Sequence, residues 1–244
     1  MTRQRLMRTV GVDHQLAFGS LRRCRLFHRL AEPLLRSLAE SVRLRRYRRG
    51  EVVFHQGDPG DSLHVVKAGS VKIVLPSREG DEAIVATLRA GDFFGELTLL
   101  DGLPRSASAV ALGPTETLLL PRSRFLALVE AEPQLRSELL VALSSEVRRM
   151  NDHVEELHFL DLGGRLAARL LQIAQDEAAA VAGADGGVTL DLPYTQGDLA
   201  AMIGGTRQSV HRVLLDLEHE RLIELSGQHI VIPSLERLVA RAET

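Results

Sequence analysis

Cysteine and aromatic residues are scarce in this sequence, and their scarcity excludes several kinds of site. Among 244 residues there is one cysteine, Cys24, no tryptophan, and an aromatic content of 4%. One cysteine can form neither an internal disulfide nor a four-cysteine iron–sulfur cluster. Glu155 and His158 have the spacing of a metal-binding pair on a helix, but a single pair does not complete a metal site. We therefore expect no metal, no iron–sulfur cluster and no haem.

Long hydrophobic runs are also missing. No stretch of 18 apolar residues occurs, and the first 25 residues contain no apolar segment of the length found in secretion signals. We therefore expect a cytoplasmic protein that makes no membrane contact. The sequence also has neither the glycine–lysine run of a phosphate-binding loop nor a dinucleotide-binding fingerprint. These absences argue against an enzyme, and we expect no catalytic residues.

Charge is unevenly distributed, although the net charge is only −2. Residues 1–50 contain 13 arginines and three carboxylates, a balance of +10, whereas residues 165–244 contain 7 arginines and 11 carboxylates, a balance of −4. Residues 1–25 are predicted to form a basic N-terminal extension, and a solvated tail is favoured over a dedicated nucleic-acid arm. Charge alone does not identify a nucleic-acid-binding protein here.

The most regular hydrophobic pattern lies in residues 133–161. This spacing of apolar residues, in alternating steps of three and four, is typical of the narrow seam of a two-stranded coiled coil. The simplest partner for such a seam is a second copy of the chain. We therefore predict a dimerisation helix over residues 133–161. Its seam residues are Leu140, Leu143, Val147, Met150, Val154 and Leu157.

Residues 26–132 combine one or two short helices with a series of short strands. A hydrophobic stripe between residues 26 and 42 indicates the helices. Runs of Val, Ile and Leu separated by glycine-containing turns predict the strands, at residues 52–54, 63–66, 70–75, 83–88 and 107–111. Strands at such even spacing predict an antiparallel barrel or jelly roll, and a closed barrel of this size can hold one small ligand.

One segment, residues 91–107, interrupts the strand pattern and carries residues suited to a phosphate. Gly95 lets the backbone approach a ligand closely, and a helical turn that starts at Glu96 would direct free N–H groups toward an anion. Arg105 can bind a phosphate through its planar fork, and Ser106 can add a hydroxyl donor. Glu96 would repel a phosphate, so its expected role is to accept a hydrogen bond from a ribose hydroxyl. The alternative is a structural ion pair between Glu96 and Arg105.

Residues 162–244 are predicted to form a winged helix-turn-helix. Thr195 opens one helix, two glycines end it, and Thr206 caps a second helix. Residues 222–225 and 229–232 are predicted to form the hairpin of the wing. The second helix carries polar side chains near its start, where a recognition helix meets base edges. The predicted DNA-binding residues are Thr195, Thr206, Arg207, Gln208, Ser209, His211 and Arg212.

The segment with the phosphate-binding residues resembles the phosphate-binding cassette of cyclic-nucleotide-binding domains. That cassette runs Gly-Glu-Leu, several apolar residues, then Pro-Arg and a small residue, as this chain does between Gly95 and Ser106. The resemblance implies that the Gly-Glu-Leu turn and the arginine bind a cyclic phosphate, and that the glutamate binds the ribose. The cassette residues carried over are Gly95, Glu96, Leu97, Arg105 and Ser106.

With the dimerisation helix and the helix-turn-helix, the chain from about residue 26 onward resembles the catabolite activator (CRP/FNR) family of bacterial transcription regulators. The implied fold is α+β: an antiparallel β-roll, a long dimerisation helix and a C-terminal winged helix-turn-helix. The implied partners are a second copy, pseudo-palindromic double-stranded DNA and RNA polymerase. The likeness places a hinge at Asp161, Gly163 and Gly164. The family usually has Glu where this chain has Gln208, so the half-site sequence is not implied.

The dimerisation helix departs from the cyclic-AMP-responsive branch of that family. A Thr followed by Ser or Asn reaches the adenine there, whereas this chain has Met150 and Asn151. Met150 offers no useful hydrogen bond, but Asn151 keeps both a donor and an acceptor. Cyclic AMP is the expected effector and cyclic GMP stays open. The alternatives are a regulator that is independent of nucleotides or answers to another effector, and a cyclic-nucleotide sensor that acts on a protein partner.

Overall fold

The computed structural model describes residues 13–77, 79–175, 180–182, 187–227 and 229–243. The chain forms two compact units, and the boundary between them falls after Val147, inside helix α5 (Pro133–Phe159). Strand β5 also crosses the boundary, because Asp81–Ile84 belongs to the second unit. The long helix predicted over residues 133–161 is confirmed to within two residues at its C-terminal end.

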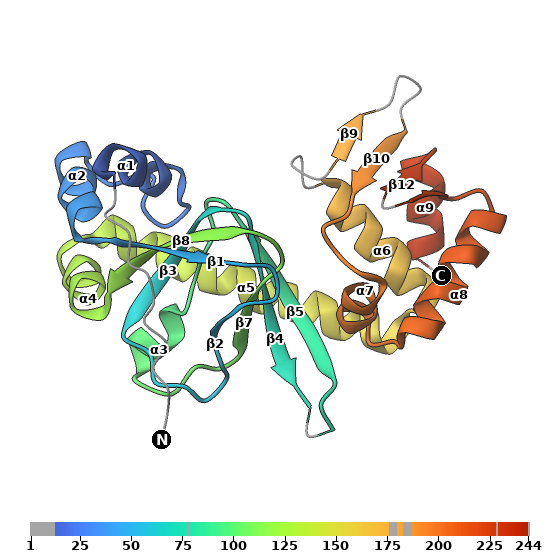
Figure 1. Ribbon diagram of the computed structural model, residues 1–244, viewed down its shortest axis with the longest axis horizontal. Helices are drawn as coiled ribbons and strands as arrows, with labels where there is room; N and C mark the ends of the chain where they lie inside the picture. Colours follow the sequence, from blue (N-terminus) through green and yellow to red (C-terminus); the bar gives the residue numbers. More distant parts are fainter. Residues whose placement is uncertain (1–12, 78, 176–179, 183–186, 228, 244) are drawn as a thin grey trace. The chain divides into compact units, whose positions relative to one another are not determined.

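The first unit is built on two four-stranded sheets (Figure 1), and every strand pair recorded in them is antiparallel. One sheet has the order β1-β8-β3-β6 and the other β2-β7-β4-β5. The predicted β-roll is therefore confirmed. Its strands are β1 (Arg43–Tyr47), β2 (Val52–Phe54), β3 (Ser62–Ala68), β4 (Ser70–Pro76), β5 (Glu82–Arg89), β6 (Phe93–Phe94), β7 (Ser108–Ala111) and β8 (Thr115–Pro121).

Four helices accompany the sheets of the first unit, besides the start of α5. They are α1 (His14–Arg23), α2 (Glu32–Ser41), α3 (Glu96–Asp101) and α4 (Arg122–Ala131). Side chains from α1, α2, α4, β3, β8 and the beginning of α5 share one hydrophobic core. Helix α3 lies in the segment that the sequence singled out for phosphate binding.

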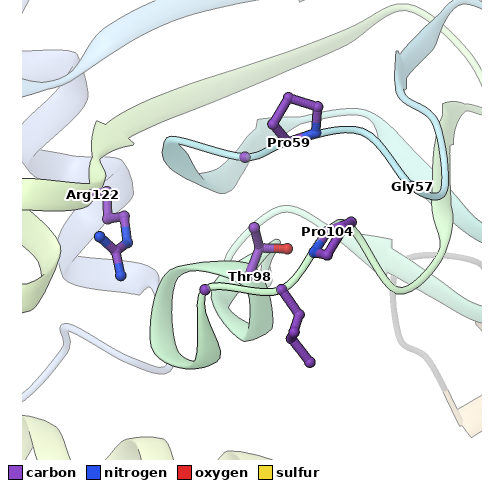
Figure 2. A pocket seen from close by; sticks show the side chains of 8 residues that line it. Gly57, Pro59, Thr98, Pro104 and Arg122 are labelled. Atoms are coloured by element: carbon purple, nitrogen blue, oxygen red, sulfur yellow. The ribbon is translucent and has the colours of Figure 1, made fainter.

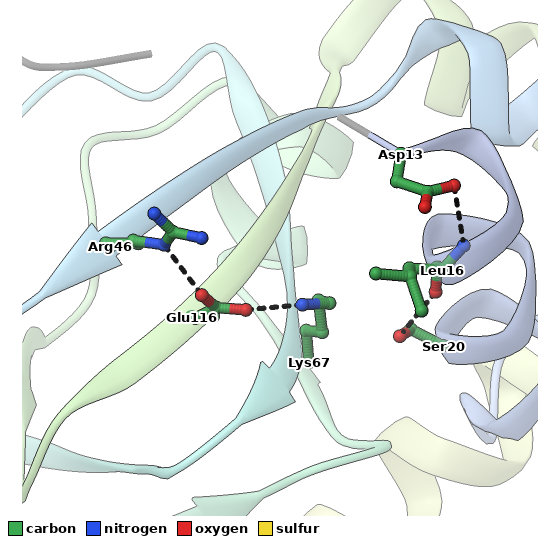
Figure 3. Close-up of polar contacts among 6 residues, drawn as sticks. All are labelled: Asp13, Leu16, Ser20, Arg46, Lys67 and Glu116. Carbon is green, nitrogen blue, oxygen red and sulfur yellow. Dashed lines mark hydrogen bonds and ion pairs between the residues drawn. The ribbon is translucent and has the colours of Figure 1, made fainter. Parts of the chain in front are cut away.

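The predicted N-terminal extension is wrong from Asp13 onward. The Asp13 carboxylate caps α1, because it accepts hydrogen bonds from the backbone N–H groups of Gln15 and Leu16. Figure 3 shows the bond from Leu16. Ala17 and Leu21 are fully buried in the core, while the arginines occupy the other face of the helix. The abundance of arginine concealed this narrow apolar face. The prediction for residues 1–12 lies outside the described part of the chain.

Strand β1 was not predicted, because three of its five residues are arginines. It lies at the edge of its sheet and pairs with β8, also unpredicted, and Leu44 and Tyr47 face the interior. Glu116 on β8 accepts a hydrogen bond from Arg46 at 2.7 Å and one from Lys67 on β3 (Figure 3). These two hydrogen bonds, with Lys67 as the larger cause, lower the pKa of Glu116. The charged residues thus tie three neighbouring strands together.

The second unit packs helices on a small sheet of order β11-β12-β10-β9, also antiparallel. The predicted wing hairpin is present as β11 (Glu224–Ser226) and β12 (His229–Ile232), although Gln228 in its turn lies outside the described residues. Two further strands extend the wing into a sheet, and they were not predicted. The other elements are α6 (Leu162–Gln175), β9 (Ala180–Ala182), β10 (Val188–Asp191), α7 (Gln196–Ile203), α8 (Arg207–His219) and α9 (Leu235–Ala242).

Candidate ligand site and nucleic-acid interface

Arg105 is the most deeply buried of the predicted phosphate-binding residues, at 5% exposure. Its Nη1 donates to the carbonyl oxygen of Gly95 at 2.6 Å, and its Nη2 donates to that of Ser62 at 2.9 Å. The Nε–H is buried and has no hydrogen-bond partner in the described chain. A buried donor without an acceptor is costly, so this group is suited to an anionic ligand.

Two glycines make room for this guanidinium. A Cβ at Gly95 would come within 2.3 Å of Nη1, and one at Gly60 within 2.5 Å of Cζ. Gly95 also has a φ of +84°, which disfavours any other residue, and it forms the N-cap of α3. Gly95 was predicted to lie in the site because it begins the Gly-Glu-Leu part of the cassette. Gly60 and Ser62 were missed, because they precede Arg105 by more than 40 residues.

An aromatic cluster lies against Arg105. The guanidinium carbon lies 4.2 Å from the centre of the Phe54 ring, within the range of a cation–π contact. Phe54 contacts His64 edge-on, with ring centres 5.7 Å apart, and His64 stacks on Phe94 at 4.9 Å. Burial lowers the pKa of His64 to about 3, and the charge of Arg105 acts in the same direction. No short-range pattern in the sequence could have identified this cluster.

Glu96 opens helix α3, as predicted, and is half-buried. Burial raises its pKa above the ordinary value, and the nearby Glu146 carboxylate on α5 acts in the same direction. The alternative of a Glu96–Arg105 ion pair is not observed in the described chain, whose recorded contacts to Arg105 are the carbonyls of Gly95 and Ser62 and the ring of Phe54. Glu96 is therefore available to accept a hydrogen bond from a ligand.

The remaining cassette residues are exposed. Leu97 is 41% exposed on α3, and the Ser106 side chain is exposed after Arg105. Met150 and Asn151, the two predicted ligand-site residues on α5, lie on the part of the helix that belongs to the second unit, and both are exposed. Their participation in the ligand site stays a prediction.

A separate pocket of about 450 Å³ lies between the loop after β2 and the end of α3 (Figure 2). Pro59 and Pro104 lie on its facing loops, and the Thr98 side chain lies beside Pro104. Arg122 lines it as well, and its Nε donates to the carbonyl of Leu99 at 3.1 Å. None of the predicted ligand-binding residues lines this pocket, so we do not assign the ligand to it.

The predicted helix-turn-helix is present as α7 and α8. Thr195 and Asp198 form the capping box that the sequence predicted, and Gly204 ends α7 with a φ of +67°. Thr206 caps α8 through the backbone N–H of Ser209, whose hydroxyl in turn accepts from the Thr206 N–H. Thr206 and Ser209 thus shape the start of the helix, a structural role that the sequence did not predict for Ser209.

The start of α8 presents a polar surface. Val210, Leu214 and Leu217 are buried against the rest of the unit, as predicted. The exposed side chains are those of Arg207, Gln208, His211 and Arg212. Arg207 and Arg212 make no recorded hydrogen bond or ion pair within the described residues, so both guanidinium groups are available to bases or phosphates.

The predicted hinge is a break between α5 and α6 at Leu160 and Asp161. Gly163 and Gly164, which we placed in the hinge, are buried in the first turn of α6. The Asp161 carboxylate accepts the backbone N–H of Gly164 at 2.6 Å and is paired with Arg241 of α9. The contact with Arg241, 80 residues away, was not predictable from the sequence.

The predicted dimer seam on α5 is largely uncovered. Leu140, Val147, Met150 and Val154 are between 53% and 65% exposed, and Leu157 is 41% exposed. Leu143 instead packs against the core of the first unit. Exposed apolar side chains in a row on one helix are suited to contact with another protein chain, and the dimer stays a prediction.

Comparison with known proteins identifies both units. Residues 44–132 match the model of the cyclic nucleotide-binding domain, and residues 164–241 match that of the Crp-like helix-turn-helix domain. The chain is 32% identical over 222 residues to the CRP-like cAMP-activated global transcriptional regulator of Mycobacterium tuberculosis, covering 91% of this chain and 98% of the relative. The chain belongs to the CRP/FNR family of transcription regulators.

Solved structures show a fold similar to that of this chain. FixK2 of Bradyrhizobium japonicum superimposes with a TM-score of 0.73 at 25% identity, over 82% of this chain and 96% of FixK2. The c-di-GMP responsive global regulator CLP of Xanthomonas campestris has a TM-score of 0.70 at 24% identity, over 80% of this chain and 95% of CLP. The CRP/FNR relatives are transcription regulators, so the expectation of a non-enzymatic protein is confirmed. Among the described helices, none is long and apolar enough to cross a membrane.

Proposed function

We propose that this protein is a homodimeric, DNA-binding transcription regulator whose effector is a cyclic nucleotide, most simply cyclic AMP. The observation that carries the effector assignment is the buried Arg105 guanidinium, whose Nε–H has no partner in the described chain. A cyclic phosphate offers the anionic oxygens that such a group requires. The cyclic AMP assignment is supported by the name of the M. tuberculosis relative.

In this proposal each cassette residue has a distinct task. Arg105 and the backbone at Gly95 and Leu97 hold the phosphate, and the Ser106 hydroxyl adds a donor. Glu96 accepts a hydrogen bond from the ribose hydroxyl. Asn151 supplies a donor and an acceptor for the purine ring, while Met150 packs in the seam.

Binding to DNA would follow from dimerisation through α5. Two copies would place their α8 helices about 34 Å apart, one turn of DNA, on a pseudo-palindromic site. Arg207, Gln208 and Arg212 would contact bases, and His211, Thr195, Thr206 and Ser209 would line the DNA surface. The ligand could change DNA affinity only through a differential affinity for two arrangements of the chain, with Asp161 and the start of α6 as the hinge. RNA polymerase contact and a cytoplasmic location complete the proposal.

The domain limits are proposed accordingly. The cyclic-nucleotide-binding domain extends to residue 132 and includes α1, the dimerisation helix follows over residues 133–161, and residues 162–244 form the DNA-binding domain. The Crp-like helix-turn-helix match over residues 164–241 supports the last of these limits.

A second candidate is the same regulator with a different effector. Met150 supports it, because a thioether cannot read a purine by hydrogen bonding. The solved structure of CLP, which is named for its response to c-di-GMP, supports it as well, since effectors differ among proteins of this fold. A regulator that needs no effector belongs to the same alternative.

Calorimetric titration of the purified protein with cyclic AMP and cyclic GMP, with and without Arg105→Ala, tests the effector. We expect binding of one nucleotide that is lost in the variant. Arg36→Ala is the control, because it removes an exposed arginine that is paired with Glu32 on α2 and lies outside the cassette. No binding of either nucleotide by the natural protein would contradict the cyclic-nucleotide proposal and favour another effector.

DNA binding is tested separately. Arg207→Ala should weaken binding to the specific operator by about 1–3 kcal/mol, and binding to random DNA by much less. An equal loss on both DNAs would mean that Arg207 contacts only phosphate. Affinity should also fall steeply with salt; a flat salt dependence would contradict DNA as the partner.

A further inference from the structure

The Arg105 guanidinium is buried without a carboxylate partner. No ion pair recorded in the described chain includes it, and Asp61, Glu96 and Asp58 act on its charge only from a distance. Its two hydrogen-bond acceptors are neutral backbone carbonyls, those of Gly95 and Ser62. A bound carboxylate would neutralise the arginine and compete with an anionic ligand. The guanidinium of Arg105 is therefore held in place by neutral groups, and its positive charge stays available to an anionic ligand.

Phe54 is the group that contacts the guanidinium in place of a carboxylate. Its ring centre lies 4.2 Å from Cζ of Arg105, and the negative face of an aromatic ring attracts a cation while carrying no net charge. Unlike a carboxylate, the ring offers no oxygen for which a phosphate would have to compete. Phe54 ends strand β2, so the sheet fixes its position.

Two further rings hold Phe54. His64 on β3 and Phe94 on β6 both lie with their ring centres 5.7 Å from that of Phe54, and both are buried. A charged imidazole at this place would repel Arg105. Burial keeps His64 neutral, since its pKa is about 3. The aromatic support of Arg105 is therefore rigid and uncharged at neutral pH.

We propose that Phe54 is a positioning residue for Arg105: its ring fixes the guanidinium by a cation–π contact so that the N–H groups are preorganised for an anionic ligand. The inference that this ligand is a cyclic phosphate rests on the proposed function. The inference that Phe54 fixes the orientation of the guanidinium is independent of the proposed function, because it concerns the protein without ligand.

The first experiment compares Phe54→Leu with Phe54→Tyr. Leucine keeps an apolar side chain but removes the aromatic face, whereas tyrosine retains the face. We expect calorimetry to show that Phe54→Leu weakens cyclic AMP binding by roughly 3- to 30-fold and that Phe54→Tyr binds as the natural protein does. Thermal unfolding of each variant checks that the domain is folded.

The second experiment needs no nucleotide. Nuclear magnetic resonance of the arginine side chains measures rotation about the Nε–Cζ bond, and Arg105→Lys assigns the Arg105 signal. In the ligand-free protein we expect slow rotation for the natural sequence and for Phe54→Tyr, and at least several-fold faster rotation for Phe54→Leu. A purely structural role for Phe54 would change stability without freeing this one guanidinium.

The two experiments separate the positioning role from the proposed function. Equal rotation in Phe54→Leu and the natural protein would overturn the positioning role, whatever happens to affinity. Faster rotation in Phe54→Leu with no nucleotide bound by the natural protein would support the positioning role and contradict the cyclic-nucleotide effector. Faster rotation with unchanged nucleotide affinity would overturn the claim that the orientation of Arg105 serves this ligand.

Discussion

Arg241 on α9 donates hydrogen bonds to both carboxylate oxygens of Asp161, at 3.2 Å to Oδ1 and 3.0 Å to Oδ2. The same guanidinium fills the space beside residue 163, where a Cβ would lie only 2.0 Å from Nη2. A side chain at residue 163 would therefore have to displace the Arg241 guanidinium, whereas the backbone angle of Gly163 is not one that requires glycine. The break between α5 and α6 is therefore held by the C-terminal helix.

Arg241→Ala should destabilise the second unit by up to about 1 kcal/mol, because the pair with Asp161 is partly exposed. Arg241 is the main cause of the lowered pKa of Asp161. A lowered pKa contributes stability that is present above the ordinary Asp pKa of about 4 and is lost as the pH falls through the lower value. Thermal unfolding as a function of pH should therefore show that the stabilities of Arg241→Ala and the natural protein become equal in acid. Arg237→Ala is the control, since Arg237 donates to backbone carbonyls of Glu220 and Arg221 and its effect should persist in acid.

Gly60→Ala should reduce affinity for the cyclic nucleotide by roughly 10- to 100-fold, the cost of disturbing a charge-assisted hydrogen bond. The added Cβ would displace the Arg105 guanidinium, because it would lie 2.5 Å from Cζ. Gly113→Ala is a matched control, since a Cβ there meets nothing within 4 Å. Calorimetric titration of both variants checks this, and equal affinities would show that Arg105 adapts without loss.

Glu96→Gln should stabilise the ligand-free protein at neutral pH, by up to about 1 kcal/mol, while weakening nucleotide binding. The pKa of Glu96 is raised by burial, so its ionisation disfavours the folded state at pH values above that raised pKa. The gain in the variant should therefore be present at neutral pH and disappear below the ordinary Glu pKa of about 4.3. Thermal unfolding from neutral to acidic pH measures it, and a variant less stable than the natural protein at neutral pH would contradict the prediction.

If the proposed homodimer forms through α5, Val147→Glu should convert it to a folded monomer. Val147 is 57% exposed in the single chain, so a charge there costs little in folding but would be buried in the seam of a dimer. Ser145→Glu is the control, because it adds the same charge on the opposite face of α5 under the predicted heptad. Sedimentation measures the mass of each variant. A dimer that survives Val147→Glu would mean that the chain associates through another surface.

Short-range sequence patterns predicted those elements whose conformation is determined by residues close together in the chain. The alternating spacing of apolar residues predicted helix α5, and the residues around Thr195 predicted a capping box. The helix and the capping box are both present in the structure. Strand β1 was missed because three of its five residues are arginines and its two buried residues, Leu44 and Tyr47, are three positions apart, so no period of two is visible. The pairing with β8 decides its conformation. Helix α1 was missed for a related reason, since a narrow buried face that includes Ala17 and Leu21 carries its packing.

The candidate site likewise contains residues that the sequence predicted and residues that only the folded structure reveals. The cassette motif predicted Arg105 and Glu96 as ligand-binding residues from their spacing, but it gave no sign of the groups that surround them. Phe54 and Gly60 precede Arg105 by 51 and 45 positions in the chain, and only the folded β-roll brings them together. A single sequence contains no local signal for such contacts, just as it contains none for Asp161 and Arg241.

Strand β1 has a consequence for how copies of this chain can assemble. An outer strand offers unpaired backbone groups to any other strand, but three arginines on five residues would place like charges opposite each other in a pairing of two copies. This repulsion between arginines disfavours the addition of further copies of the chain to the sheet at strand β1. The exposed apolar row on α5 offers a different kind of contact. In the proposed dimer two copies would cover this row mutually, and such a contact closes at two instead of continuing into a filament.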